Sequence, residues 1–180
     1  MTLEVVVIAV YRVIGTLPVL RWPFVGGLLS VVVDLFDLLL INLLDLGGIP
    51  DYQSLDKYLD QFQLACFLFV AVRRWSGVER RVAVGLYLYR LIGFVTFELT
   101  GARSILLVFP NVFEFWFLLV AGLHAARRVP DWTPRRLLVV LGILLGLKEI
   151  QEWALHDARL FDQITFIDAL RLIWRTNTGG

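Results

Sequence analysis

Residues 24–46 have the sequence FVGGLLSVVVDLFDLLLINLLDL, in which aliphatic and aromatic side chains form an almost continuous run. A helix needs ~20 mainly apolar residues to cross the ~30 Å hydrocarbon core of a bilayer. The segment is long enough, and Asp34 and Asp37 interrupt it near its middle. It therefore predicts a membrane-spanning helix that carries two carboxylates at mid-depth.

The composition of the whole chain agrees with a membrane protein. Of its 180 residues, 58% are hydrophobic and 18% are charged, whereas soluble domains are nearer half apolar and a quarter charged. With Gly 14, Pro 6 and Cys 1, the chain is not a collagen-like, disordered or disulfide-rich protein. Its formal net charge of +1 gives no reason to expect nucleic acid as a partner.

The same criterion of length and hydropathy predicts six spans in all, at residues 3–20, 24–46, 55–75, 82–100, 104–126 and 134–155. Pro110 lies inside the fifth span and predicts a kink there. Residues 160–174 are apolar but short, and predict an amphipathic helix at the membrane surface. The predicted fold is an all-α, polytopic helical bundle that forms a single transmembrane domain over residues 1–180.

Arginines gather in two of the predicted short loops. The loop between the third and fourth spans contains Arg73, Arg74, Arg80 and Arg81, and the loop between the fifth and sixth contains Arg127, Arg128, Arg135 and Arg136. Two spans separate these loops, so the positive-inside rule predicts both in the cytoplasm, together with Arg21. Both termini and the acidic segment with Asp51, Asp56 and Asp60 are then expected on the opposite side.

Ionisable residues inside the predicted spans are the candidates for function, because each one near the bilayer centre costs roughly 2.5–3.5 kcal/mol. The predicted intramembrane charged core is Arg12, Asp34, Asp37, Arg90 and Glu114. A secondary polar cluster is predicted from Asp45, Asp60, Glu98, Lys148, Glu149, Glu152 and His156. Helical spacing places the aspartates at 34, 37 and 45 on one face, and the polar residues at 148, 152 and 156 on another.

Two interpretations of these charges are open. The arginines can pair with the acids and hold the helices in register, which is an architectural role. However, the acids outnumber the basic residues within the spans, and surplus buried acids must be protonated, hydrated or bound to a cation. This surplus of acids is the basis of the second interpretation, in which the charged residues form a functional site.

A possible internal repeat links the two halves of the chain. Residues 11–15, YRVIG, resemble residues 89–93, YRLIG, and residues 34–37, DLFD, resemble residues 111–114, NVFE. If the matches are not chance in a chain rich in aliphatic residues, three spans per unit predict an inverted repeat of the kind found in secondary transporters.

Three functional hypotheses remain. The first is a small transport or ion-binding protein with a buried acidic and arginine core, coupled to a proton or cation. The second is a structural or assembly subunit bound to another membrane protein or to a second copy of itself. The third is an intramembrane, metal-dependent enzyme on a lipid or isoprenoid, with Asp34 and Asp37 as candidate Mg²⁺ ligands. Neither the isolated Cys66 nor any motif assigns a nucleophile or a cofactor.

Overall fold

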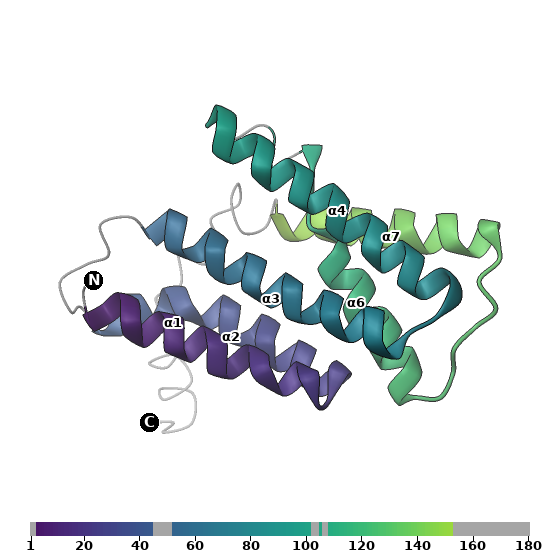
Figure 1. Cartoon of the computed structure of the whole chain (residues 1–180), viewed down its shortest axis with the longest axis horizontal. Helices are drawn as coiled ribbons and strands as arrows, with labels where there is room; N and C mark the ends of the chain where they lie inside the picture. The colour runs from purple at the N-terminus through teal and green to yellow at the C-terminus, as the bar shows by residue number, and fades with distance from the viewer. Residues whose placement is uncertain (1–2, 45–51, 102–104, 106–107, 153–180) are drawn as a thin grey trace, which may run out of the picture.

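The computed structural model describes residues 3–44, 52–101, 105 and 108–152, and over these residues the chain is all-α, with six helices and no strand (Figure 1). The helices are α1 (Leu3–Thr16), α2 (Pro23–Leu44), α3 (Tyr52–Arg74), α4 (Gly77–Thr100), α6 (Val112–Ala125) and α7 (Pro134–Glu152), with a short 3₁₀ turn, η1, at Leu17–Leu20. Each helix overlaps the residue range of one predicted span, although α3 and α4 begin three and five residues before theirs. The predicted surface helix at 160–174 falls outside the described residues.

Prolines and a capping threonine set several of the helix ends. α1 ends at Thr16, two residues before Pro18, and α2 begins at Pro23, where proline is favoured because the first helical N–H has no partner in the helix. The start of α7 is capped by Thr133, whose Oγ1 accepts a hydrogen bond from the Arg136 N–H at 3.3 Å.

The prediction of one kinked helix over residues 104–126 is wrong, because the chain is broken rather than bent at Pro110. Ile105 and Val108 are helical, the next three residues are not, and α6 begins only at Val112. Proline lacks the N–H that would continue the ladder. α6 has 14 residues, which at 1.5 Å per residue is about 21 Å, well short of the ~30 Å hydrocarbon thickness.

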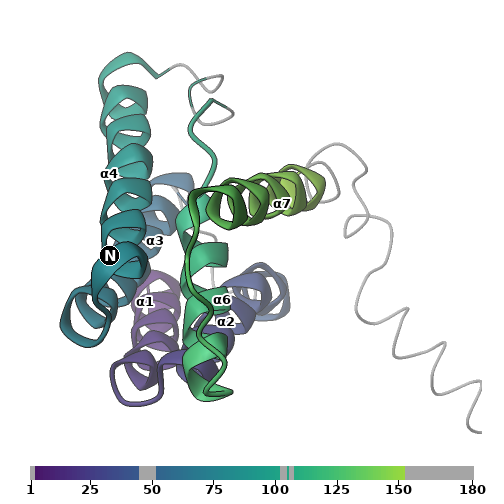
Figure 2. The same cartoon turned by 90° about the vertical axis from the view of Figure 1, so that its right-hand side faces the viewer.

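The short helix α6 is the centre of the bundle. It contacts α2, α3, α4 and α7, whereas α1 packs on α2 and α3. Figure 1 shows α1, α2 and α3 running side by side, with the far end of α4 splayed away from α3. Figure 2 shows α7 beside α6, on the side away from α1.

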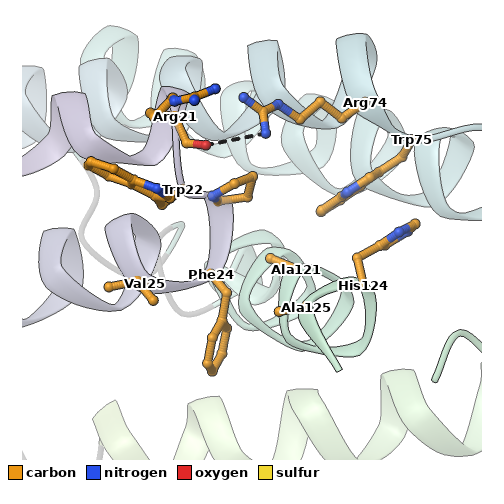
Figure 3. Close-up of a pocket in the computed structure, with 10 residues that line it drawn as sticks. Arg21, Trp22, Phe24, Val25, Arg74, Trp75, Ala121, His124 and Ala125 are labelled. Carbon is orange, nitrogen blue, oxygen red and sulfur yellow. Dashed lines mark hydrogen bonds between the residues drawn. The ribbon is translucent and has the colours of Figure 1, made fainter. Parts of the chain in front are cut away.

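The first turn, the end of α3 with the start of α4, and the end of α6 meet at one end of the bundle, called here the arginine-rich end; Figure 3 shows Arg21, Arg74 and His124 from these segments. The Arg74 guanidinium, at the end of α3, donates to the carbonyl oxygens of Leu20 and Arg21 in the first turn, the latter at 3.4 Å. His124, near the end of α6, bonds to Glu79 at the start of α4 with a separation of 2.7 Å. These contacts bring the turn at Arg21 and both predicted arginine-rich loops to one face.

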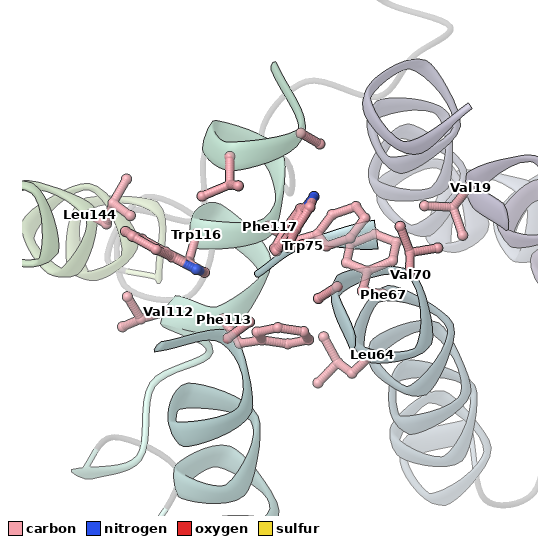
Figure 4. Close-up of a cluster of buried hydrophobic side chains, with 14 residues drawn as sticks. Val19, Leu64, Phe67, Val70, Trp75, Val112, Phe113, Trp116, Phe117 and Leu144 are labelled. Atoms are coloured by element: carbon pink, nitrogen blue, oxygen red, sulfur yellow. The ribbon is translucent and has the colours of Figure 1, made fainter. Parts of the chain in front are cut away.

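The apolar core lies where α3 and α6 meet (Figure 4). It comprises Val19, Leu64, Phe67, Val70, Ala71, Trp75, Ala83, Val112, Phe113, Trp116, Phe117, Val120, Ala121 and Leu144. Phe67 and Phe117 stack with their ring centroids 4.2 Å apart, a geometry that adds to the free energy of burying the two rings.

By length and composition, one described helix, α4, is a candidate to cross a membrane. Three other apolar helical segments, Val5–Leu20, Pro23–Phe36 and Val112–Ala125, are too short for that criterion. The break at Pro110 accounts for the last of these.

Candidate functional site

Arg12 lies at the junction of α1, α2 and α3, and three aspartates surround its guanidinium. Its Nη1 pairs with Asp34 of α2. Its Nη2 donates to Asp60 Oδ1 of α3 at 2.6 Å and lies 3.7 Å from Asp56 Oδ1. Asp56 and Asp60 are one helical turn apart, so both carboxylates reach the same guanidinium.

The arginine is enclosed, whereas its partners are open on one side. The Arg12 side chain is 2% exposed, but those of Asp34, Asp56 and Asp60 are 33%, 36% and 35% exposed. One oxygen from each aspartate lies within 4.8 Å of the other two. The cluster therefore combines one fixed positive charge with three carboxylates that remain accessible.

Close contact between α1 and α2 holds Arg12 in this position. The hydroxyls of Thr16 and Ser30 form a buried hydrogen bond of 2.9 Å, four residues beyond Arg12 on α1. A Cβ on Gly15 would lie 2.7 Å from the methyl carbons of Val33, so the absence of a side chain there allows the helices to approach. Ser30 also continues the polar face that Asp34 begins.

Of the predicted core, the structure brings Arg12 and Asp34 together, and Asp60 lies with them rather than with a secondary cluster. Sequence reasoning placed Asp60 near the outer end of its span and missed both Asp56 and Asp60 as partners of Arg12. The signal was available in part, because the two aspartates are spaced for one helical face. Which helix that face meets is a tertiary property.

Arg90 has a different environment from Arg12. Its Nη1 donates to the main-chain carbonyl oxygen of Phe109 at 2.7 Å, and the neighbouring Tyr89 hydroxyl donates to the carbonyl of Val108. These carbonyls lie just before the break at Pro110, where the helix supplies no N–H for them. The two sequences that suggested a repeat therefore put their arginines to different uses, and the inverted repeat stays a prediction.

Glu114 is buried in the first turn of α6 and accepts a hydrogen bond from Asn111 Nδ2 at 3.1 Å. The Oδ1 atom of Asn111 is itself buried without a hydrogen-bond partner. The charged groups that act on Glu114 electrostatically are Lys148, Asp60, Arg12 and Arg90. Glu114 is therefore linked to the Arg12 cluster by charge, without an observed ion pair between them.

The other predicted residues are dispersed. Glu98 lies 3.6 Å from Lys57 Nζ, Lys148 Nζ donates to Gln151 at 3.1 Å, and Glu149 is exposed. The side chains of Asp37 and Glu152 fall outside the described residues, as do Asp45 and His156 altogether. The proposed pairing of Asp34 with Asp37 on a metal ion stays a prediction, and Asp34 already has Arg12 as a partner.

A second buried acid, Glu79, was not singled out from the sequence. Its carboxylate pairs with His124 Nε2 at 2.7 Å and accepts from Trp132 Nε1 at 2.9 Å, and its carbonyl oxygen accepts from Trp116 Nε1 at 3.3 Å. The residue precedes Arg80 in a segment that the sequence identifies as a solvated loop. Two tryptophans that need acceptors were the only sequence signal for it.

A comparison of the chain with protein-family models, curated proteins and solved structures gives no significant match.

Proposed function

We propose that the chain is a multi-pass membrane protein that binds and transports a proton or a small cation through the Arg12 cluster. The distribution of side chains supports the membrane location. Polar residues turned inward include Arg12, Thr16, Ser30, Gln63, Glu79, Asn111 and Glu114. Large apolar residues turned outward include Val10, Ile14, Val25, Leu28, Val32, Ile92, Val95, Leu99, Leu138 and Ile143. This arrangement is unfavourable in water and favourable in lipid.

The gathering of arginine-rich connections at one end supports a single orientation. Because the positive-inside rule counts Lys and Arg in short loops, we propose that this end faces the cytoplasm. Leu3, at the start of α1, and the first turn of α3 then face the opposite side. In that orientation Asp56 and Asp60 lie in the outer half of α3, and Arg12 lies in the half of α1 that leads to the arginine-rich end.

The excess of negative charge around Arg12 is the observation that carries the transport proposal. Of the described residues at this site, three ionised aspartates and one guanidinium sum to a formal charge of two negative units between the helices. A bilayer environment strongly disfavours such a surplus, so binding one or two protons or a monovalent cation would relieve it. Arg12 is the fixed internal charge that keeps the empty site stable enough to release what it has bound.

A proton taken up from one side would neutralise one carboxylate, and Arg12 would then keep its two ionised partners. Loss of that proton to the other side would restore three competing acceptors. A small cation would act in the same way, bound between carboxylate oxygens in place of the proton. The one-third exposure of the three aspartates is the access that this exchange needs.

Transport by the purified chain in sealed vesicles tests the proposal. A pH-sensitive dye inside the vesicles reports proton entry after a pH step, and parallel samples contain a Na⁺ or K⁺ gradient. We expect a flux above that of protein-free vesicles, lost in Asp60→Asn and retained in Asp131→Asn, whose carboxyl is in an exposed loop. Equal flux in the wild type, Asp60→Asn and protein-free vesicles would contradict the proposal.

An assembly subunit is the second candidate, and the near-complete enclosure of Arg12 favours it. An arginine bonded on several sides can simply fix three helices in register. In that case Arg12→Met would disrupt the bundle or its binding to a partner, while Asp60→Asn would leave a stoichiometric complex intact. The wild type and both variants are purified from native membranes in a single detergent, and the mass of each intact complex is measured. This measurement distinguishes the two candidate functions.

A further inference from the structure

A pocket of about 320 Å³ opens at the arginine-rich end, where the first turn, α3 and α6 meet (Figure 3). The side chains that define its chemistry are Arg21, Trp22, Phe24, Arg74, Trp75 and His124. None of the described residues that line it carries a carboxylate, and the nearby Glu79 is bonded to His124. The pocket therefore offers positive charge and aromatic surface together.

Arg74 is held in place at the mouth of this pocket. Its guanidinium donates to the carbonyl oxygens of Leu20 and Arg21, which fixes its plane and leaves further N–H groups for another acceptor. Arg21 makes no ion pair with any described residue and is exposed beside it. Two guanidinium groups on one side of a pocket are suited to a phosphate, which accepts several hydrogen bonds at once.

The aromatic side chains indicate a site at a membrane surface. Trp75 is buried and its ring lies parallel to that of His124, with centroids 6.1 Å apart and an interplanar angle of 3°. Trp22 is exposed at the rim. Tryptophans are enriched at the level of lipid headgroups, where one part of the ring is in an apolar environment and the N–H is wet.

An apolar track continues from the pocket along the outer face of α2. Val25 lines the pocket, and Leu28, Leu29, Val32 and Phe36 follow it at the spacing of one helical face, all of them exposed. A soluble phosphate compound would leave this track exposed, whereas an acyl chain would cover it. A lipid fits both features, because its phosphate can bind the arginines and its acyl chain can pack on the track.

We infer that this pocket binds the phosphate headgroup of an anionic phospholipid, with an acyl chain along the exposed face of α2. The inference rests on the proposed membrane location but not on transport. The lipid would join the first turn and the start of α2 to the ends of α3 and α6, the segments that line the pocket. Lipid bound there is distinct from anything bound at Arg12, because neither Arg12 nor any of its three aspartate partners lines the pocket.

Native mass spectrometry of the full chain released from detergent micelles tests the inference. Phosphatidylglycerol and phosphatidylcholine with identical acyl chains are added in equal amounts, and the bound fractions are compared. We expect the wild type to retain phosphatidylglycerol in preference, and Arg21→Gln to lower that preference about fivefold, the effect of one basic residue near an anionic headgroup. Arg80→Gln is the matched control, because it removes one exposed positive charge outside the pocket.

Three results would overturn the inference. Equal retention of the two lipids, or an equal loss in Arg80→Gln and Arg21→Gln, would show that no headgroup site exists at the pocket. Displacement of the lipid by glycerol phosphate at the same concentration would identify a soluble phosphate ester as the ligand instead. Since none of these measurements involves flux, a failed transport experiment leaves the lipid result intact.

Discussion

Arg90 and Phe109 are joined by a hydrogen bond of 2.7 Å from the guanidinium Nη1 to the main-chain carbonyl oxygen, and this bond caps a helix that Pro110 has interrupted. Tyr89 does the same for the carbonyl of Val108. In a bilayer, non-helical backbone is tolerated only where protein groups satisfy it. The sequence predicted that Arg90 pairs with carboxylates. In the structure its guanidinium instead donates to a main-chain carbonyl beside the break in the helix.

Replacing Arg90 with glutamine should therefore destabilise the protein. The shorter side chain leaves the half-buried Phe109 carbonyl without its donor, which costs about 1–3 kcal/mol. Thermal unfolding in detergent, followed by circular dichroism, measures the change in Tm. Arg80→Gln removes the same charge from an exposed site and should leave Tm unchanged, and equal Tm values for the two variants would refute this role for Arg90.

Two glycines of α4 give a matched test of how closely the segment around Phe109 packs against α4. A Cβ on Gly93 would lie 2.3 Å from Phe109 Cβ, whereas a Cβ on Gly85 would meet nothing within 4 Å. Gly93→Ala should lower stability, because backbone would have to move. Gly85→Ala should raise it by up to about 1 kcal/mol, since alanine favours helix. Unfolding by SDS titration compares them, and opposite signs are the expected result.

Arg12 should be among the most costly residues to remove. Arg12→Met removes the guanidinium that the three carboxylates share, and breaking a buried pair in this way typically costs about 3–5 kcal/mol. Adding Asp34→Asn and Asp60→Asn to Arg12→Met should recover part of that loss. A triple variant no more stable than Arg12→Met in the same SDS titration would mean that charge repulsion is not the cause.

The helices were predictable because their signal is local. Apolar runs of about the right length, bounded by Pro18, Pro23 and Thr133, place all six helices near their observed positions. The effect of Pro110 was underestimated, because the carbonyls it frees have donors on another helix, Tyr89 and Arg90. The sequence does not show that these donors face the freed carbonyls, and without donors a bent helix leaves fewer carbonyls unpaired than a broken one.

The candidate site was predictable only in part, because it depends on which helix faces meet. Charge balance alone predicted that Arg12 pairs with buried acids, but it did not say which ones. It could not bring Asp56 and Asp60 to the same guanidinium, since that requires α3 to pack on α1 with a particular rotation. Glu79 was hidden for the opposite reason, because the arginines around it marked its segment as solvent-exposed.

Cysteine labelling tests the orientation that the arginine-rich end implies. Because Glu79 is buried, Arg80 is the better site for a reporter cysteine, in a background with Cys66→Ala. In intact cells a membrane-impermeant maleimide should not label the cysteine of Arg80→Cys. The same cysteine should be labelled once the cells are lysed. A cysteine in place of Asp131 should behave identically. Labelling of either residue from outside intact cells would reverse the proposed orientation.

Glu79 should stabilise the arginine-rich end through its carboxylate. Glu79→Gln keeps the size of the side chain but can no longer accept from both His124 and Trp132 as an anion, and we expect a loss of about 1–3 kcal/mol. Glu149→Gln, at an exposed position of α7, should change stability by less than about 0.5 kcal/mol. Tryptophan fluorescence distinguishes a local effect from a global one, because freeing the Trp132 N–H should shift the emission while helix content stays constant. If Glu79→Gln and Glu149→Gln unfold at the same temperature with unchanged emission, the Glu79 carboxylate does not stabilise the arginine-rich end.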